Sequence, residues 1–293
     1  MRIVTAILAL FTLLAGPASA QVPDGSAKQL SDFNWQTEPK AYKVGSIAAS
    51  MTTEADEAIV TGTEAGAVMS FLQGIKGYDD VEGLVVKTEG PLANSFVVIS
   101  HDPIGYVKDD DWSTTDANSL LDSFIEGTEE GNKARAKAGV PLLKVAGWAE
   151  PPHYDKVNNT LWWAIRVEST DGQSINATAL KLSRNGYSRL IWVGDPAQFT
   201  NAADTMRPTL DRYRFDPGHQ YGDFSAGDVV AGVGLAGLAV GILKGKAGFK
   251  VATGILALAL PFLKKFGVFL VIPLLAGFRW LRQRLGKGGS PGV

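Results

Sequence analysis

The sequence predicts an α+β fold, an antiparallel sheet with packed helices, for the central part of a chain of 293 residues whose two ends are apolar. Short apolar runs between turn dipeptides indicate strands, and one long segment with apolar residues at every third or fourth position indicates a helix. The apolar ends indicate export and membrane attachment. We therefore divide the chain into a signal peptide (1–20), an exported domain (21–224), the helices of a C-terminal membrane anchor (225–285) and a basic flexible tail (286–293).

The N-terminus has the three parts of a secretory signal peptide. Arg2 supplies a positive charge, residues 3–14 are apolar, and Ala18 and Ala20 place small residues before a cleavage site. The apolar run is shorter than the roughly 20 residues that span a bilayer. We expect cleavage after Ala20, and the alternative is an uncleaved anchor. Because the chain has no cysteine, disulfides and a lipid-modified N-terminal cysteine are excluded.

The charge of the exported segment argues against nucleic acid as a partner. Residues 21–227 hold 18 Lys and Arg against 29 Asp and Glu, a net charge of −11. Binding to nucleic acid is dominated by attraction between cationic side chains and phosphates, and a segment this acidic repels phosphate backbones.

The first half of the domain is expected to mix strands with a helix. After a polar stretch (21–40), we expect a short strand at 44–49, a helix at 65–75, and strands at 84–87 and 96–101. Val68, Leu72 and Ile75 would form the apolar face of the helix.

Residues 116–138 have the pattern of a long amphipathic helix. Asp116 can cap its start, with Thr114 and Thr115 as alternatives, and Gly139 and Pro141 end it. Its apolar and small residues recur on one face: Leu120, Phe124, Gly127, Gly131, Ala134 and Ala138. The opposite face carries Glu and Lys four positions apart and is expected to be solvated.

Four strand-like runs follow, at residues 142–148, 161–167, 174–182 and 187–193. Asp171-Gly172 and Asn185-Gly186 are signals for tight hairpin turns, so we expect an antiparallel meander. A last helix is expected over residues 201–213, where Arg207-Pro208 would kink it or delay its start.

Strand alternation sends Trp162 and Trp163 to opposite faces of the meander. Trp163 shares its face with Ile165 and is predicted to lie in the core, whereas Trp162 shares its face with Arg166 and is predicted to be exposed or covered by a helix. An exposed tryptophan on a rigid sheet could contact protein, sugar or a membrane interface. The alternative is that both tryptophans are core residues.

Three basic clusters divide the apolar C-terminal region. They are Lys244, Lys246 and Lys250; Lys264 and Lys265; and Arg279, Arg282, Arg284 and Lys287. We expect a first crossing near residues 227–244 and a helical hairpin or interfacial segment at 251–278, which places the first and last clusters in the cytoplasm. We reject a single membrane-spanning helix over 251–278, because it would bury the ammonium groups of Lys264 and Lys265 in the membrane at a cost of about 2.5–3.5 kcal/mol each. In the competing topology only residues 266–281 cross, and 229–263 pack on the outer face.

Gly234, Gly237 and Gly241 are candidate helix-packing residues in the first apolar segment. Gly237 and Gly241 form a G-x-x-x-G pair, which lets two helix backbones approach closely. The second helix would come from another copy of the chain, giving a homo-oligomer, or from residues 251–263 of the same chain.

Several runs of residues together resemble a known signature. They are Phe96-Val97-Val98-Ile99-Ser100, Gly105-Tyr106-Val107, Glu126-Gly127-Thr128 with Asn132, Gly147-Trp148-Ala149-Glu150-Pro151-Pro152, Tyr154-Asp155, Leu161-Trp162-Trp163-Ala164 and Tyr221-Gly222-Asp223-Phe224. In this order they resemble a bacterial family of membrane-anchored proteins, domain of unknown function 2167, over most of residues 80–265. The sequence departs from the family at residues 174–193. The resemblance implies a signal peptide, an exported domain and a C-terminal anchor, and it implies no established activity.

No catalytic motif stands out. His101-Asp102 beside Asp109-Asp110-Asp111 could bind a divalent cation, but the run lacks the spacing and the glycine of a calcium loop, so a solvated acidic loop is the favoured interpretation. Glu150 and His153 flank two prolines, so they could present an acid and a base together or form a structural turn. We name no catalytic residue, no metal ligand and no cofactor.

The sequence leaves two functions open. In the first, the protein is a non-catalytic binding or scaffolding component on the extracytoplasmic side of the cytoplasmic (inner) membrane, with the lipid bilayer and an envelope protein as partners. The candidates for partner binding are Trp148, Glu150, His153, Tyr154 and Trp162. In the alternative, it is a membrane-bound hydrolase or metal-dependent enzyme that uses Asp102, Glu150 and His153.

Overall fold

A computed structural model of the chain describes residues 29–74, 76–112 and 116–243. The predicted signal peptide (1–20), the basic tail (286–293) and most of the predicted anchor lie outside these residues. Leu30–Asp32 form one 3-10 turn, in which the Asp32 carboxylate accepts a hydrogen bond from the backbone N–H of Gln29. The described residues from Phe33 onward belong to a second unit, which has the predicted α+β fold.

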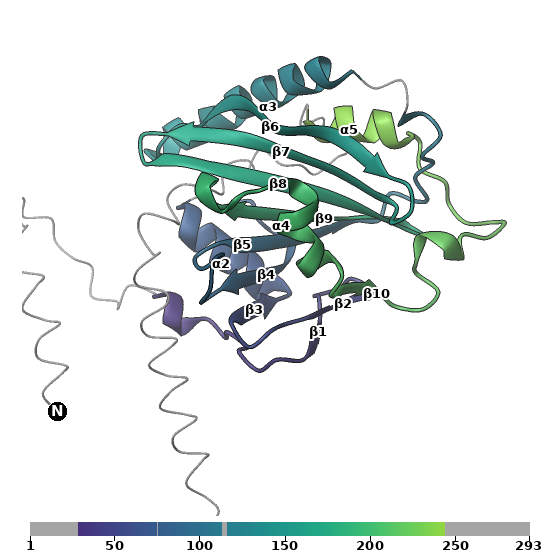
Figure 1. Cartoon of the computed structure of the whole chain (residues 1–293), viewed down its shortest axis with the longest axis horizontal. Coiled ribbons are helices and arrows are strands. Elements are labelled where there is room, and N and C mark those ends of the chain that lie inside the picture. Colours follow the sequence, from purple (N-terminus) through teal and green to yellow (C-terminus); the bar gives the residue numbers. More distant parts are fainter. Residues whose placement is uncertain (1–28, 75, 113–115, 244–293) are drawn as a thin grey trace, which may run out of the picture. The chain divides into compact units, whose positions relative to one another are not determined.

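Two antiparallel sheets form the frame of this unit (Figure 1). The strands of the large sheet are β3 (Glu57–Thr61), β4 (Val81–Lys87), β5 (Phe96–Asp102), β6 (Lys144–Asp155), β7 (Thr160–Ser169), β8 (Gly172–Ser183) and β9 (Gly186–Gly194). Their order across the sheet is β3-β4-β5-β9-β8-β7-β6. The small sheet has the order β1-β2-β10, from β1 (Ala41–Lys43), β2 (Ala49–Thr52) and β10 (Tyr213–Phe215).

The predicted meander is confirmed in strands β6 to β9. The turns fall where the Asp-Gly and Asn-Gly pairs predict them, because Ser169 pairs with Gly172 and Ser183 with Gly186. Gly186 has a φ of +153°, and a side chain there would meet the carbonyl oxygen of Asp102 at 2.0 Å. The strand predicted at 142–148 is longer than expected and continues as β6 through two prolines. Proline is tolerated there because β6 is an edge strand and its register with β7 shifts three times.

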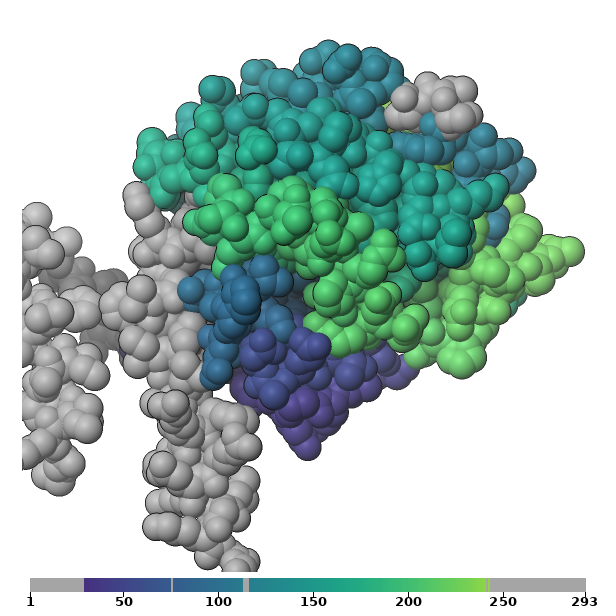
Figure 2. Space-filling view, in the orientation of Figure 1, coloured from purple at the N-terminus to yellow at the C-terminus, as the bar shows by residue number. Residues whose placement is uncertain are grey.

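Four helices flank the sheets in the described residues. They are α2 (Thr63–Gln73), α3 (Ala117–Ala138), α4 (Ala202–Leu210) and α5 (Leu235–Leu243), with short 3-10 turns η3 (Pro196–Gln198) and η4 (Tyr221–Asp223). Helix α2 packs on β3 and β4, α3 packs on β6, and α4 packs on β7 and β8. Figure 2 shows the green surface of α4 against the teal strands of the meander. The large sheet is therefore covered on both of its faces.

Local signals set most helix ends. Asp116 caps α3 by accepting hydrogen bonds from the backbone N–H groups of Asn118 and Ser119, and Gly139 ends the helix in the left-handed conformation, both as predicted. Helix α2 ends earlier than expected, at Gly74 in the same conformation. The last helix stops at Leu210 rather than at residue 213, because the chain turns into strand β10.

Two predictions for the first half are wrong. The strand expected at residues 44–49 does not form: residues 44–48 turn the chain between β1 and β2, with Gly45 at a φ of +55°, and only Ala49 belongs to a strand. Strand β3 was not predicted, although four of its five residues are buried.

The buried face of helix α3 differs from the predicted apolar face in the second half of the helix. Ala134 and Ala138 are exposed, and Arg135 is buried with its Nε donating to the carbonyl of Pro141.

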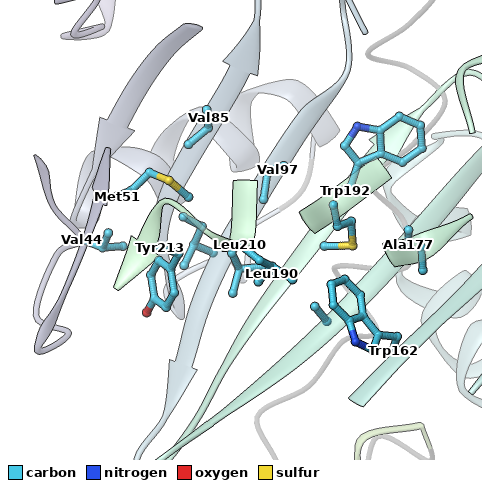
Figure 3. Packing of buried hydrophobic residues seen from close by; sticks show 14 of the residues in the cluster. Val44, Met51, Val85, Val97, Trp162, Ala177, Leu190, Trp192, Leu210 and Tyr213 are labelled. Carbon is cyan, nitrogen blue, oxygen red and sulfur yellow. The ribbon is translucent and has the colours of Figure 1, made fainter. Parts of the chain in front are cut away.

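Trp162 lies in the main hydrophobic core and is only 2% exposed. Figure 3 shows it with Trp192, Leu210 and Tyr213, on the face that α4 and the small sheet cover. Exposure of Trp162 is thus the wrong alternative, and coverage by a helix is the right one. The physical reason is that Ala202, Met206 and Leu210 of α4 bury their apolar side chains against this face.

Trp163 is 3% exposed and lies in the interior, as predicted. Its ring meets Phe124 of α3 at a centroid distance of 5.9 Å, in an edge-on arrangement. Both tryptophans are therefore core residues, each beneath a different helix.

The end of the described chain folds back onto the domain. The backbone of Tyr106 bonds to Val229 and Ala231, and α5 then packs on α3 with Leu235, Leu238, Ala239 and Ile242 buried. This packing differs from the first membrane crossing predicted near residues 227–244. The described part of α5 buries Leu235 and Leu238 against protein. None of the helices within the described ranges is long and apolar enough to cross a membrane.

The candidate packing glycines have different surroundings. A side chain at Gly234 would meet the Asp111 carboxylate at 2.4 Å, so this glycine lets Asp111 reach the start of α5 and accept a hydrogen bond from the backbone N–H of Ala236. Gly237 is exposed, and among the described residues a side chain there would meet Val233, in the bend before α5. The surroundings of Gly241 lie outside what the structure describes.

Candidate functional site

Strand β6 carries four of the five predicted binding residues and divides them between the two faces of the sheet. Trp148 pairs with Ile165 and Tyr154 with Leu161, which places both on the face covered by α3. Glu150 and His153 lie toward the face covered by α4, where His153 pairs with Trp162 of β7. The five residues therefore do not form one surface.

The two aromatic residues of β6 on the α3 face have structural partners. Trp148 donates a hydrogen bond from Nε1 to the carbonyl of Ala117 at 3.3 Å and meets Phe124 edge-on. The Tyr154 hydroxyl donates to Asp109 Oδ2 at 2.9 Å. Both contacts fasten β6 to the segment that leads into α3.

Glu150 and His153 lie near each other, with His153 Nδ1 3.4 Å from Glu150 Oε1. Glu150 also accepts a hydrogen bond at Oε2 from the backbone N–H of Ala202, the first residue of α4. The carboxylate therefore stabilises a helix N-terminus. Asp102, the third residue of the predicted enzyme site, is four strand positions away on β5, which corresponds to about 19 Å at ~4.8 Å per position. The structure does not bring the three side chains together.

The acidic run 109–111 is also used within the fold. Asp109 binds the Tyr154 hydroxyl, and Asp111 caps α5. Within the described residues, no three His, Asp or Glu side chains are grouped so that they could hold a metal ion.

Asp102 lies instead in an acidic cavity of about 700 Å³ beside the ends of β4 and β5. Its titratable lining residues are Asp79, Asp80, Glu82, His101, Asp102 and His219. Burial raises the pKa of Asp80 more than its ion pair with Arg189, at 3.1 Å, lowers it. Burial likewise lowers the pKa of His101, despite the nearby carboxylates of Asp102 and Glu82.

Three of these side chains already have protein partners. Glu82 accepts hydrogen bonds from the hydroxyl and backbone N–H of Ser46, and His101 Nδ1 lies 3.0 Å from the Ser188 hydroxyl. With Asp80 paired to Arg189, these contacts engage three of the six titratable side chains, whereas the buried Oδ2 of Asp102 has no hydrogen-bond partner in the described residues.

A second cavity, of about 320 Å³, has the opposite charge. It lies at the C-terminal end of α4, between β7, β8, β10 and η4, and its cationic side chains are Lys181, Arg207 and Arg214. Asp211 is the one carboxylate among its lining residues, and the remaining lining includes Thr160, Trp162, Leu210 and Tyr221. We call it the cationic cavity. Its charge is unusual in a segment whose net charge is −11.

Lys181 is anchored at the floor of this cavity. Its ammonium group donates to the carbonyl oxygens of Leu210, at 3.2 Å, and Tyr213, at 3.0 Å. Carbonyls at a helix C-terminus carry partial negative charge and attract a cation. Burial, helped by the positive charge of Arg214, lowers the pKa of Lys181 to about 8, and Asp211 opposes the shift.

The other donors of the cationic cavity make no direct polar contact with protein in the described residues, although the positive charge of Arg207 acts on the Asp155 carboxylate. Within the described residues, the guanidinium groups of Arg207 and Arg214 make no hydrogen bond and no ion pair. The Nε1–H of Trp162 is buried and has no acceptor there. Figure 3 shows the nitrogen edge of the Trp162 ring turned away from Trp192.

Sequence reasoning selected Trp162 but missed the three cations. Lys181 lies in the strand predicted at 174–182, Arg207 in the helix predicted at 201–213 and Arg214 just after that helix, so no local spacing links them. They meet because α4 packs across β7 and β8 and the chain then returns as β10.

The fold and the cavity together define an α+β domain that encloses a small cationic site on one face of an antiparallel sheet. The chain belongs to the family described as Protein of unknown function (DUF2167), which matches residues 36–275. The resemblance predicted from the sequence is therefore confirmed.

Comparisons with curated proteins and with solved structures give no information on function. A comparison with curated proteins gave no match. Among solved structures, the chain is similar to cyanobacterial PsbP (CyanoP) from Synechocystis sp. PCC 6803, solved in solution. The identity is 11%, the alignment covers 66% of this chain and 99% of that chain, and the TM-score is 0.37. A likeness this distant does not bear on function.

Proposed function

We propose that the protein is a non-catalytic binding or scaffolding component of the bacterial envelope, with its domain outside the cytoplasmic membrane and its C-terminal segment in the bilayer. The observation that carries the binding role is the cationic cavity. There, Arg207 and Arg214 present guanidinium groups without protein partners, beside a buried indole N–H that also lacks one. Both arginines are exposed, so water can satisfy them in the absence of a ligand, whereas the indole N–H is buried and would gain a hydrogen bond from a ligand that reaches it.

The carboxylates that the enzyme hypothesis requires have other roles. Glu150 stabilises the start of α4, and Asp102 lies four strand positions away. A general acid and base must reach one substrate together, which this arrangement does not support. We therefore keep the binding role as the proposal.

The packing of α5 on α3 also changes the topology that we propose. Because Leu235 and Leu238 are buried against the domain, this helix should stay on the same side of the membrane as the domain. The single crossing near residues 266–281 then becomes the simplest anchor, with the basic cluster after Arg279 in the cytoplasm.

A reporter that is active only in the cytoplasm tests this topology. Fused after Val293 it should be active, and fused near Asn201 or after Lys246 it should be silent, because α5 keeps the intervening chain outside. Activity at Lys246 with silence at Asn201 would restore a crossing near residues 227–244. Activity at Asn201 would refute export of the domain.

A photo-reactive residue at the rim of the cavity tests the binding role. Val157 lines the cavity and is 89% exposed, so a photo-crosslinker there should form a defined adduct in native membranes. Ile125 is the matched control, because it is exposed on α3, which covers the other face of the sheet. The adduct should disappear when Arg207 and Arg214 are both replaced by Gln. Equal adducts at the two positions, or none at Val157, would contradict the proposal.

A further inference from the structure

We infer that the cationic cavity binds a phosphate group, with Arg207, Arg214, Lys181 and the indole N–H of Trp162 as its donors. The inference rests on the proposed function, since it names the ligand of the same cavity. The phosphate could belong to a small soluble molecule or to a lipid headgroup, and the experiment below separates these sources.

The charge of the lining matches a phosphate better than a carboxylate. Three cationic side chains and one carboxylate, Asp211, leave an excess of two positive charges around the cavity when Lys181 is protonated. A phosphate monoester carries about −1.5 to −2 charges at neutral pH and has three strong acceptor oxygens. A single carboxylate would neutralise only half of this excess.

The donors also fit an acceptor in number and kind. Lys181 uses two of its three ammonium hydrogens on the carbonyls of Leu210 and Tyr213, which leaves one for a ligand. Arg207 and Arg214 can each offer two parallel N–H groups, the geometry that binds phosphate oxygens in pairs. One phosphate could accept from the remaining Lys181 hydrogen, the indole N–H and two N–H groups of each arginine, and the other guanidinium N–H groups would stay with solvent.

The buried indole separates this cavity from an ordinary basic patch. Trp162 is 2% exposed, lines the cavity and has an Nε1–H with no acceptor in the described residues. Trp163 and Trp192 also have buried, unpartnered indole N–H groups, but neither of them lines the cavity. Trp192 therefore offers a control within the same core cluster.

The size of the cavity limits the ligand. A volume of about 320 Å³ is at the lower end of the range for small-molecule sites, roughly 300–1,000 Å³. The site can enclose one phosphate group with a short attached stem, and the rest of a larger ligand would extend past Val157 into solvent.

Calorimetric titration of the full chain in phosphatidylcholine nanodiscs with inorganic phosphate tests the inference. The double variant Arg207→Gln with Arg214→Gln should lower the affinity at least about tenfold, because it removes two charge-assisted contacts. Arg166→Gln is the matched control, since Arg166 is exposed on β7 and does not line the cavity, and it should leave the affinity unchanged. Trp162→Phe should lower the affinity about threefold to tenfold, whereas Trp192→Phe should not.

Further arms identify the source of the phosphate. Acetate should bind more weakly than phosphate. The titration with inorganic phosphate is repeated in nanodiscs that contain phosphatidic acid and in nanodiscs that contain phosphatidylglycerol at the same charge. Equal affinity for inorganic phosphate in both supports a soluble phosphate as the ligand. Loss of binding only in the phosphatidic acid discs supports a lipid headgroup.

Three results would overturn the inference: no phosphate binding, equal affinity in the Arg207, Arg214 and Arg166 variants, or tighter binding of acetate. The proposed function fails separately. An adduct at Val157 that depends on both arginines, without phosphate binding, would leave the binding role standing and remove only phosphate as its ligand.

Discussion

Replacing Trp162 or Trp163 by alanine should lower the free energy of unfolding by about 3–5 kcal/mol in each case. Each indole is almost completely buried, Trp162 beneath α4 and Trp163 against Phe124 of α3. Truncation would remove an aromatic ring from close packing and leave a cavity that the two helices cannot fill. Chemical denaturation of the purified chain, followed by near-ultraviolet circular dichroism, measures both losses.

The comparison between the two variants is the critical part of this experiment. The alternation of residues along β7 alone predicts a large loss only at Trp163, whereas the packed structure predicts similar losses at both. Val157→Ala, at an exposed position in the turn before β7, serves as a control and should change stability by less than about 0.5 kcal/mol. A loss below about 1 kcal/mol at Trp162 would show that α4 does not cover this face.

Replacing Glu57 by glutamine should lower the free energy of unfolding by about 3 kcal/mol or more. The Glu57 side chain is only 1% exposed, and its two carboxylate oxygens accept hydrogen bonds from the two terminal guanidinium nitrogens of Arg212, Nη1 at 2.5 Å and Nη2 at 2.8 Å. Lys87 lies 3.5 Å away. The substitution removes the buried negative charge that Arg212 binds most closely, so the desolvation of Arg212 is poorly compensated, whereas Lys87 keeps its ion pairs with Asp56 and Glu54.

Glu54 provides the matched control for this prediction. It contacts the same two cations, Lys87 at 2.8 Å and Arg212 at 3.7 Å, but its side chain is 48% exposed. Solvent weakens such a pair, and Glu54→Gln should cost less than about 1 kcal/mol. Thermal or urea denaturation at neutral pH distinguishes the two variants. Similar small losses at both positions would mean that Glu57 is accessible to water.

The elements that the sequence predicted are those with local signals. The meander follows from two Gly-containing turns, and the start of α3 follows from Asp116 as a cap. Strand β3 was missed because its conformation depends on pairing with β4, beyond helix α2 in the sequence. The turn at residues 44–48 is local to the hairpin of β1 and β2, and its Gly45 has a φ of +55°. Alternation along β7 does not show whether the face that carries Trp162 is exposed or covered. Helix α4 covers this face, and Trp162 is therefore buried.

In the candidate site, too, the features that depend on tertiary contacts could not be predicted from the sequence. Glu150, beside two prolines, and the aromatic Tyr154 were candidate binding residues, but tertiary contacts give them structural partners, Ala202 and Asp109. The cationic cavity joins residues of β8, α4 and the start of β10, which only the folded chain brings together. Its chemistry could be predicted only after the packing of α4 was known.

The two edge strands of the large sheet, β3 and β6, affect whether neighbouring copies of this domain can associate by strand addition. Sheet edges invite added strands, which is a common start of aggregation. Here Pro151 and Pro152 remove backbone donors from β6, and three register shifts distort it. At the other edge, Gln36 occupies both backbone hydrogen-bonding groups of Ile59 on β3. Neighbouring copies can therefore lie side by side on a surface without polymerising through their strands.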